Sequence, residues 1–147
     1  MTIERVFDAS PEVVFDTWFD PDAQEEIYSE GIPPGYSVLE FAIDLRVGGT
    51  CTVVIGSAEG EPDRITYVLT EVDRPRRLAC RTSMFVGDWG RTVDFTQTIT
   101  FEEQGGKTLL TLVQAGFETE EDRDSFKGGA PGFLDGVAKA AASRAGR

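Results

Sequence analysis

The sequence predicts an α+β fold in which a strongly curved antiparallel sheet of about six or seven strands surrounds one long C-terminal helix. Three observations support this prediction. Strand-like runs with alternating apolar residues fill the middle of the chain, turn residues separate these runs, and the last ~30 residues have a helical composition. Strands in succession followed by a helix are typical of α+β folds, and 147 residues suit one domain over residues 1–147.

The first expected elements are a strand and two short helices. Ile3 to Phe7 form a strand-like run. Ser10 is a good N-cap and Pro11 suits the first helical position, so a helix is expected to begin there. It should end at Asp20-Pro21, because the residue before a proline disfavours the α-helical region. A second short helix is expected over about Asp22 to Ser29.

The central strands are expected to follow a loop at Gly31 to Gly35. In the run from Tyr36 to Leu45, alternation places Glu40 on one face and a more apolar set on the other, so we expect Glu40 to point outward. That apolar set is Leu39, Phe41, Ile43 and Leu45. Further strands are expected at Thr50 to Ile55, Arg64 to Val72, Leu78 to Phe85, Thr92 to Glu102 and Thr108 to Val113.

The last expected element is a helix that starts near Thr119. This residue supplies an N-cap, and the acidic residues 120–122 suit the first turn. The segment from Gly128 to Gly132 contains Pro131, which predicts either a kink or a split in this helix. The pattern leaves both outcomes open.

Composition and charge exclude several classes of partner. Asp and Glu number 26 against 14 Lys and Arg, so the net charge is −12. Such a charge repels phosphate backbones and anionic lipids, and we expect neither nucleic acid nor membrane as a partner. The first residues lack the basic and apolar regions of a signal peptide, which predicts a cytoplasmic protein.

Histidine is absent, which removes the usual general acid–base group and the imidazole ligand of most transition-metal sites. Cys51 and Cys80 lie in separate strand-like runs and form no CxxC pair, so buried free thiols are expected rather than a disulfide or a metal site. We therefore assign no catalytic residue, no metal and no cofactor.

Motifs along nearly the whole chain resemble the family of activators of heat shock protein 90 ATPase homologues, within the SRPBCC or START-like (Bet v-like) superfamily of helix-grip proteins. No single motif is specific, but their order and spacing are typical of that family. The motifs are Arg5 to Glu12 with Val14 and Trp18, Asp20-Pro21, Asp44 to Gly49, Glu71-Val72 with Pro75 and Arg77-Leu78, Thr100 to Glu103, Gly105-Gly106 and Thr108 to Leu112.

The resemblance implies a cavity between the last helix and the concave face of the sheet. Members of the superfamily include lipid carriers, polyketide cyclases, aromatases and chaperone regulators, so the resemblance implies function far less than fold. Small residues stand where relatives often have leucines, namely Val137, Ala138, Ala140 and Ala141. They indicate either a roomier cavity or a helix that sits closer to the sheet.

Strand alternation then predicts which side chains line this cavity. Gln97 and Gln114 are polar groups among apolar neighbours, so each should meet a partner, a water or a ligand, and one alternative is that they bond each other. The Tyr67 hydroxyl is a candidate donor to a ligand carbonyl. The predicted lining is Trp18, Tyr28, Cys51, Val53, Tyr67, Cys80, Thr82, Phe95, Gln97, Leu112, Gln114, Phe133 and Val137. Trp89 is either a lid or an exposed loop aromatic.

Three functions remain after these exclusions. The leading hypothesis is binding or sequestration of a small hydrophobic molecule, for example an aromatic or polyketide-like one. It is preferred because no close acid–base pair is evident. One alternative is a cyclase, aromatase or hydrolase without metal or histidine, using Tyr67, Glu40 or Gln97 to orient a substrate. Another is a chaperone-interacting regulatory domain. A homodimer through an exposed sheet edge is also considered.

Overall fold

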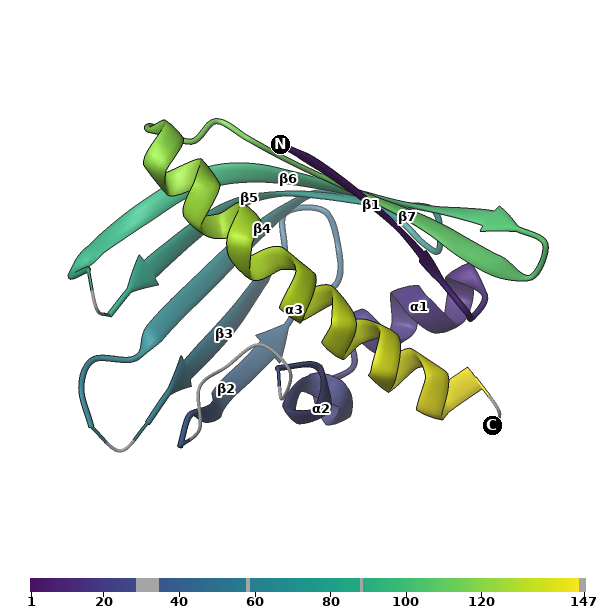
Figure 1. The fold of residues 1–147 in the computed structure, drawn as a ribbon, viewed down its shortest axis with the longest axis horizontal. Coiled ribbons are helices and arrows are strands. Elements are labelled where there is room, and N and C mark those ends of the chain that lie inside the picture. Colours follow the sequence, from purple (N-terminus) through teal and green to yellow (C-terminus); the bar gives the residue numbers. More distant parts are fainter. Residues whose placement is uncertain (29–34, 58, 88, 146–147) are drawn as a thin grey trace.

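The computed structural model describes residues 1–28, 35–57, 59–87 and 89–145. Within these ranges the chain forms one seven-stranded antiparallel sheet, two short helical segments after the first strand and one long helix near the C-terminus, which confirms the predicted fold class (Figure 1). The strands are β1 (Thr2–Phe7), β2 (Ser37–Ile43), β3 (Thr50–Gly56), β4 (Asp63–Asp73), β5 (Arg77–Val86), β6 (Arg91–Gln104) and β7 (Lys107–Ala115). The helices are α1 (Pro11–Trp18), the 3₁₀ turn η1 (Pro21–Ala23), α2 (Gln24–Tyr28) and α3 (Glu120–Ala145).

The strand order in the sheet is β1-β7-β6-β5-β4-β3-β2. Neighbours along the chain therefore pair by hairpins, except that β1 pairs with β7, with Thr2 opposite Val113 and Phe7 opposite Thr108. β1 and β2 form the two edges. The sheet curves, and α3 lies across its concave side while α1 and α2 lie at the end where α3 finishes (Figure 1).

The segment after α1 differs from the single helix expected over Asp22 to Ser29. Asp22 belongs to the 3₁₀ turn, and the α-helix begins only at Gln24. The cause is local: the Asp20 carboxylate accepts the Asp22 amide at 2.9 Å and caps the turn. The Gln24 side chain then donates to the carbonyls of Trp18 and Asp20 at 3.0 and 2.8 Å, satisfying the end of α1. Ser29 and the predicted loop residues 31–34 lie outside the described residues.

A β-bulge in β2 overturns part of the predicted alternation. The pairing with β3 shifts between Val38 and Glu40, so that Leu39 is 55% exposed although it was expected on the inward face. The extra residue at a bulge reverses the order of faces on either side of it. Val38 points inward before the bulge and Phe41 after it, whereas Glu40 faces outward as predicted.

Helix α3 runs without a break through Pro131, so the predicted split does not occur. Its start agrees with the predicted cap, because the Thr119 hydroxyl accepts the Asp122 amide at 3.1 Å. Proline removes one hydrogen bond from the helix interior, and packing of the apolar face of α3 offsets that loss. None of the helices in the described part of the chain is long and apolar enough to cross a membrane.

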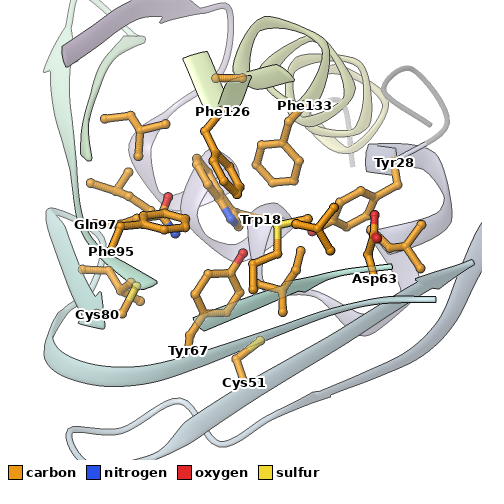
Figure 2. Close-up of a pocket in the computed structure, with 18 of the residues that line it drawn as sticks. Trp18, Tyr28, Cys51, Asp63, Tyr67, Cys80, Phe95, Gln97, Phe126 and Phe133 are labelled. Atoms are coloured by element: carbon orange, nitrogen blue, oxygen red, sulfur yellow. The ribbon is translucent and has the colours of Figure 1, made fainter. Parts of the chain in front are cut away.

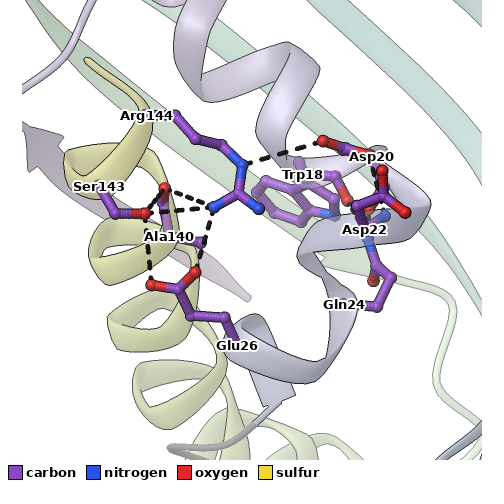
Figure 3. Close-up of polar contacts among 8 residues, drawn as sticks. All are labelled: Trp18, Asp20, Asp22, Gln24, Glu26, Ala140, Ser143 and Arg144. Carbon is purple, nitrogen blue, oxygen red and sulfur yellow. Dashed lines mark hydrogen bonds and ion pairs between the residues drawn. The ribbon is translucent and has the colours of Figure 1, made fainter. Parts of the chain in front are cut away.

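Arg144 connects the end of α3 to the segment from Trp18 to Tyr28, which includes the 3₁₀ turn and α2 (Figure 3). Its guanidinium donates to the Glu26 carboxylate at 3.1 Å and to the Ala140 carbonyl at 3.0 Å, and it lies 3.8 Å from the Asp20 carboxylate. The same segment carries Trp18 and Tyr28, whose rings are buried in the core. The contact therefore fixes the C-terminal end of α3 against the segment that carries these two rings.

Candidate functional site

A cavity of about 410 Å³ lies between the concave face of the sheet and α3 (Figure 2). This volume falls within the ~300–1,000 Å³ typical of small-molecule sites. Most lining side chains are aromatic or aliphatic. They are Trp18, Phe19, Tyr28, Tyr36, Cys51, Ile55, Asp63, Ile65, Tyr67, Leu69, Leu78, Cys80, Met84, Val86, Trp89, Phe95, Gln97, Ile99, Leu112, Ser125, Phe126, Ala130 and Phe133.

Two groups of aromatic rings shape the cavity. In the first, Phe133 of α3 packs edge-on against Trp18 and tilted against Tyr28, with ring centroids 5.1 and 5.2 Å apart. In the second, Phe95 of β6 stacks on Phe117 at 4.6 Å, and Phe126 of α3 lies 4.9 Å from Phe95. Aromatic pairs at such distances are stabilising beyond their buried area. Five of these rings, those of Trp18, Tyr28, Phe95, Phe126 and Phe133, line the cavity.

Three polar side chains, those of Gln114, Gln97 and Thr82, form a hydrogen-bonded row beside the cavity. The Gln114 amide donates to the Gln97 carbonyl oxygen at 2.9 Å, and the Gln97 amide donates to the Thr82 hydroxyl at 3.0 Å. The two glutamines thus bond each other, which was one of the alternatives drawn from the sequence. Gln97 alone of these three residues lines the cavity. Because the carbonyl oxygen and the amino group of Gln97 each have a second hydrogen-bonding position, Gln97 retains the capacity to meet a ligand.

Tyr67 points its hydroxyl into the cavity from β4 (Figure 2). Burial raises the pKa of Tyr67 well above its ordinary value, with the neighbouring Tyr28, Cys80 and Cys51 adding to the rise and Gln97 offsetting part of it. Burial also raises the pKa of Tyr28 above its ordinary value. Both phenols therefore stay protonated at neutral pH. They can donate a hydrogen bond to a ligand oxygen, but they are unsuited to act as general bases.

The two thiols in the cavity wall are poor nucleophiles. Burial, with a smaller effect of Cys80, raises the pKa of the Cys51 thiol to about 12. Burial raises the pKa of Cys80 as well, and the Thr82 hydroxyl offsets part of that rise. Since the thiolate is the reactive form, the lining offers weak hydrogen-bonding groups here rather than covalent chemistry. Among the residues that the structure describes, no cluster of acids and cysteines is arranged to hold a metal ion.

Asp63 is the one ionisable carboxylate among the lining residues of the described chain. Its Oδ1 accepts the backbone N–H of Gly87 at 2.8 Å, which joins the start of β4 to the end of β5. Gly87 is required there, because a Cβ at this position would overlap the carbonyl of Glu61. The side chain is half-buried at the end of the cavity.

The structure brings most of the predicted lining residues together around one cavity. Trp18, Tyr28, Cys51, Tyr67, Cys80, Phe95, Gln97, Leu112 and Phe133 all contribute to its wall. Val53, Thr82, Gln114 and Val137 do not, since they are buried behind the wall in the core or in the polar row. Alternation identifies the inward face of a strand, but not which inward residues reach the empty space.

Several lining residues were missed, and a helical spacing could have found some of them. Phe126, Ala130 and Phe133 follow one another at four and three residues, which places them on one face of α3. Asp63 and Tyr36 carried no such signal, because Asp63 is the first residue of β4 and Tyr36 directly precedes β2. Trp89 is 43% exposed and lines the cavity, with the Arg91 guanidinium 5.1 Å from its ring centroid. Both alternatives for Trp89 therefore hold in part.

Glu40 lies outside the cavity. Its side chain is 55% exposed and forms a loose ion pair with Arg64 at 3.9 Å on the outer face of the sheet. It cannot take part in the chemistry considered for it in the cyclase or hydrolase alternative. Tyr67 and Gln97 are the remaining polar groups of that alternative that reach the cavity.

The small residues of α3 bring helices together rather than widening the cavity. Val137, Ala140 and Ala141 are fully buried and do not line the cavity. At Gly136 a Cβ would overlap the carbonyl of Ile27, so α3 touches the backbone of α2. Of the two alternatives raised by the sequence, the structure does not have the roomier cavity, and the close contact of α3 at Gly136 is with α2 rather than with the sheet.

A long helix held against a curved antiparallel sheet, with an apolar cavity between them, defines the helix-grip fold, whose members generally bind ligands. The family comparison agrees with this class. The chain belongs to the family of activator of Hsp90 ATPase homolog 1-like proteins, whose family model matches residues 8–142. A comparison with curated proteins gives no match.

Solved structures with the same fold come from several bacteria. A protein from Rhizobium leguminosarum superposes with a TM-score of 0.78 at 21% identity, covering 97% of this chain and 93% of its own. The Mll3558 protein from Rhizobium loti has a TM-score of 0.77 at 23% identity, with 95% and 94% coverage. Protein Ms6760 from Mycobacterium smegmatis has a TM-score of 0.72 at 21% identity, with 95% and 86% coverage. At these identities the likeness concerns the fold.

Proposed function

We propose that this protein binds a small apolar molecule, of aromatic or polyketide-like shape, in the cavity between α3 and the sheet, and that it carries or sequesters this molecule unchanged. The observation that supports the proposal most directly is the aromatic cavity of about 410 Å³, into which the Tyr67 hydroxyl points (Figure 2). A flat apolar body fits the walls, and Tyr67 and Gln97 offer hydrogen bonds to one oxygen of the ligand.

Binding is favoured over catalysis by the protonation states of the cavity groups. Tyr28, Tyr67, Cys51 and Cys80 all have pKa values raised by burial, so each is neutral near pH 7. Phenols and thiols that stay neutral can orient a ligand and exclude water but are poor general bases and nucleophiles, and Asp63 is the one acid in the described wall. This arrangement supports binding without chemical change.

The test is native mass spectrometry of the protein purified from its own host, followed by chemical analysis of any released molecule. The Ala130→Leu variant fills the cavity from α3, because Ala130 lines it and is buried. The Ala142→Leu variant is the control, since residue 142 is exposed on the same helix. We expect the bound mass in the wild type and in Ala142→Leu, and its loss in Ala130→Leu with an unchanged circular dichroism spectrum.

Two results would count against the proposal. A bound mass that persists in Ala130→Leu would place the ligand elsewhere. A released molecule that differs from the one supplied would favour the cyclase or hydrolase alternative. A thermal-shift screen gives a second measure, because a ligand at ~100 times its Kd raises the free energy of unfolding by about 2.7 kcal/mol.

A further inference from the structure

The charge of the cavity wall limits which ligands can bind, in addition to the limits set by the shape of the cavity. Among the described lining residues there is no lysine and no arginine, and the chain contains no histidine. Asp63 is the one formally charged side chain in that wall. A carboxylate or phosphate on a ligand would lose its hydration here without gaining a countercharge, which is strongly unfavourable.

Asp63 is held in position by the fold itself. One carboxylate oxygen accepts the Gly87 N–H at 2.8 Å, and the tight contact of Gly87 with the backbone of Glu61 keeps that N–H in place. In the described part of the chain Asp63 has no ion-pair partner. A fixed, half-buried carboxylate that lacks a cation is suited to receive one from a ligand.

One arginine that contacts a lining residue, Arg91, is already paired. Arg91 packs against Trp89, but both of its terminal nitrogens donate to the Asp122 carboxylate, at 2.5 and 3.2 Å. The charge of Arg91 is therefore balanced by Asp122, and Asp63 stays uncompensated. The contact of Arg91 also indicates that the Trp89 ring accepts a cation on its face.

We propose that the ligand is an amine, in which an apolar body occupies the cavity and a protonated amino group pairs with Asp63 at its end. This inference rests on the proposed function, because it names the ligand class of the same cavity. The ammonium group would gain a charge-assisted hydrogen bond to the free carboxylate oxygen and the attraction of the neighbouring aromatic rings.

The test uses three probes with one ring system and different charges: 1-naphthylmethylamine, 1-naphthalenemethanol and 1-naphthoate. Their dissociation constants are measured by isothermal titration calorimetry at pH 7.5 with the wild type and with two variants. Asp63→Asn removes the charge and keeps an oxygen that can accept the Gly87 N–H. Glu61→Gln, at an exposed residue two positions earlier, removes the same charge outside the cavity and is the matched control.

We expect the wild type to bind the amine roughly three- to tenfold more tightly than the alcohol, and the naphthoate most weakly of all. In Asp63→Asn the amine and the alcohol should bind equally, whereas Glu61→Gln should keep the preference. If Asp63→Asn and Glu61→Gln lost the preference for the amine equally, the preference would come from the overall negative charge of the protein, and the inference would be overturned. Binding of the alcohol without any preference for the amine would overturn it while leaving the proposed function intact, and binding of none of the probes would overturn both.

Discussion

Cys51 and Cys80 lie on strands β3 and β5, with β4 between them. Strands are spaced ~4.8 Å apart, so the two α-carbons are separated by more than the ~7 Å that a disulfide allows. Both cysteines are free and buried. We therefore expect no disulfide between them in the folded protein.

The raised pKa values predict slow reaction of these thiols. With a pKa of about 12, roughly one Cys51 side chain in ten thousand is a thiolate at pH 8. We expect labelling by Ellman's reagent to be at least ~100-fold slower in the native protein than in the urea-unfolded chain. Stopped-flow absorbance measures both rates. Rapid labelling of one thiol in the native state would contradict the burial that raises its pKa.

Gly136 offers a test in which two effects oppose each other. Alanine is ~1 kcal/mol better than glycine inside a helix, so the Gly136→Ala change should stabilise α3 on propensity alone. The added Cβ would overlap the Ile27 carbonyl, however, and the helices would have to separate. We expect a net loss of about 1–3 kcal/mol in the free energy of unfolding, measured by urea titration. A gain in stability would mean that α3 and α2 are farther apart than described.

Single residues were predictable where a repeating pattern surrounds them and not where the pattern breaks. The inward positions of Gln97 and Tyr67 followed from alternation along uninterrupted strands. Leu39 was placed on the wrong face because a bulge adds one residue to β2, and nothing in the local sequence marks the bulge. Asp63 was missed because its position depends on a hydrogen bond with Gly87, which follows the end of β5.

At the scale of elements, the N-terminal end of α3 is tied to the sheet by an ion pair. The Asp122 side chain is 3% exposed and its partner Arg91, at the start of β6, is half exposed. Hydrogen bonds from Arg91 lower the pKa of the Asp122 carboxyl, and the Thr119 hydroxyl contributes in the same direction while burial opposes both. The ion pair keeps α3 over the cavity at the end where Phe126 lines it.

This ion pair predicts a particular dependence on pH. Because the folded-state pKa of Asp122 lies below the ordinary value of 3.8, the contribution of its charge is fully present above that value. It is lost as the pH falls through the lower folded-state pKa. We therefore expect the Asp122→Asn variant to be less stable than the wild type at pH 7, and the difference to shrink as the pH falls below about 4. Urea unfolding at a series of pH values measures it.

The matched control is Asp124→Asn, which removes an acid from the same helical turn. The Asp124 side chain is 65% exposed and, among the described residues, forms one loose ion pair, with its neighbour Arg123. Exposed pairs of this kind contribute little, so this variant should follow the wild type at every pH. A constant difference between wild type and Asp122→Asn across the pH range would show that the Asp122 charge is not what holds α3.

The strands and the long helix were predicted more reliably than the segments that connect them. All the strands and the long helix were expected near their observed bounds, since each has a continuous apolar pattern and a capping or turn residue at its ends. The 3₁₀ turn before α2 depends on the Asp20 cap and on two side-chain bonds from Gln24, which no periodicity reveals. The continuity of α3 through Pro131 depends on its packing against α1 and α2 rather than on propensity.

For the whole molecule, the net charge of −12 predicts that salt stabilises the fold. Like charges repel more in the compact state than in the unfolded chain, and salt screens that repulsion. We expect the midpoint of urea unfolding at pH 7 to rise between about 0.02 and 0.5 M NaCl. The same titration near the isoelectric point of about 4.3 is the control, because the net charge there is close to zero. An equal rise at both pH values would indicate a general salt effect instead.

The fold as a whole was accessible from the sequence, whereas the cavity was accessible only in outline. Family membership and fold are shared with proteins at about 20% identity, and a fold kept over such distances does not define a ligand. The proposed amine is argued from the charge of the wall, and that charge depends on Asp63, whose partner Gly87 lies 24 positions away in the sequence.

The pairing of β1 with β7 also bears on how the protein is made. Phe7 and Thr108 face each other, so about a hundred residues separate the two halves of this strand pair. At ~5–20 residues per second, a ribosome takes roughly 5–20 seconds to supply the second strand after the first. During that time Thr2–Phe7 has no partner, while the hairpins from β2 to β6 can already form beside it. The growing chain therefore leaves β1 unpaired until β7 has been synthesised, and during that time a chaperone could bind its open edge.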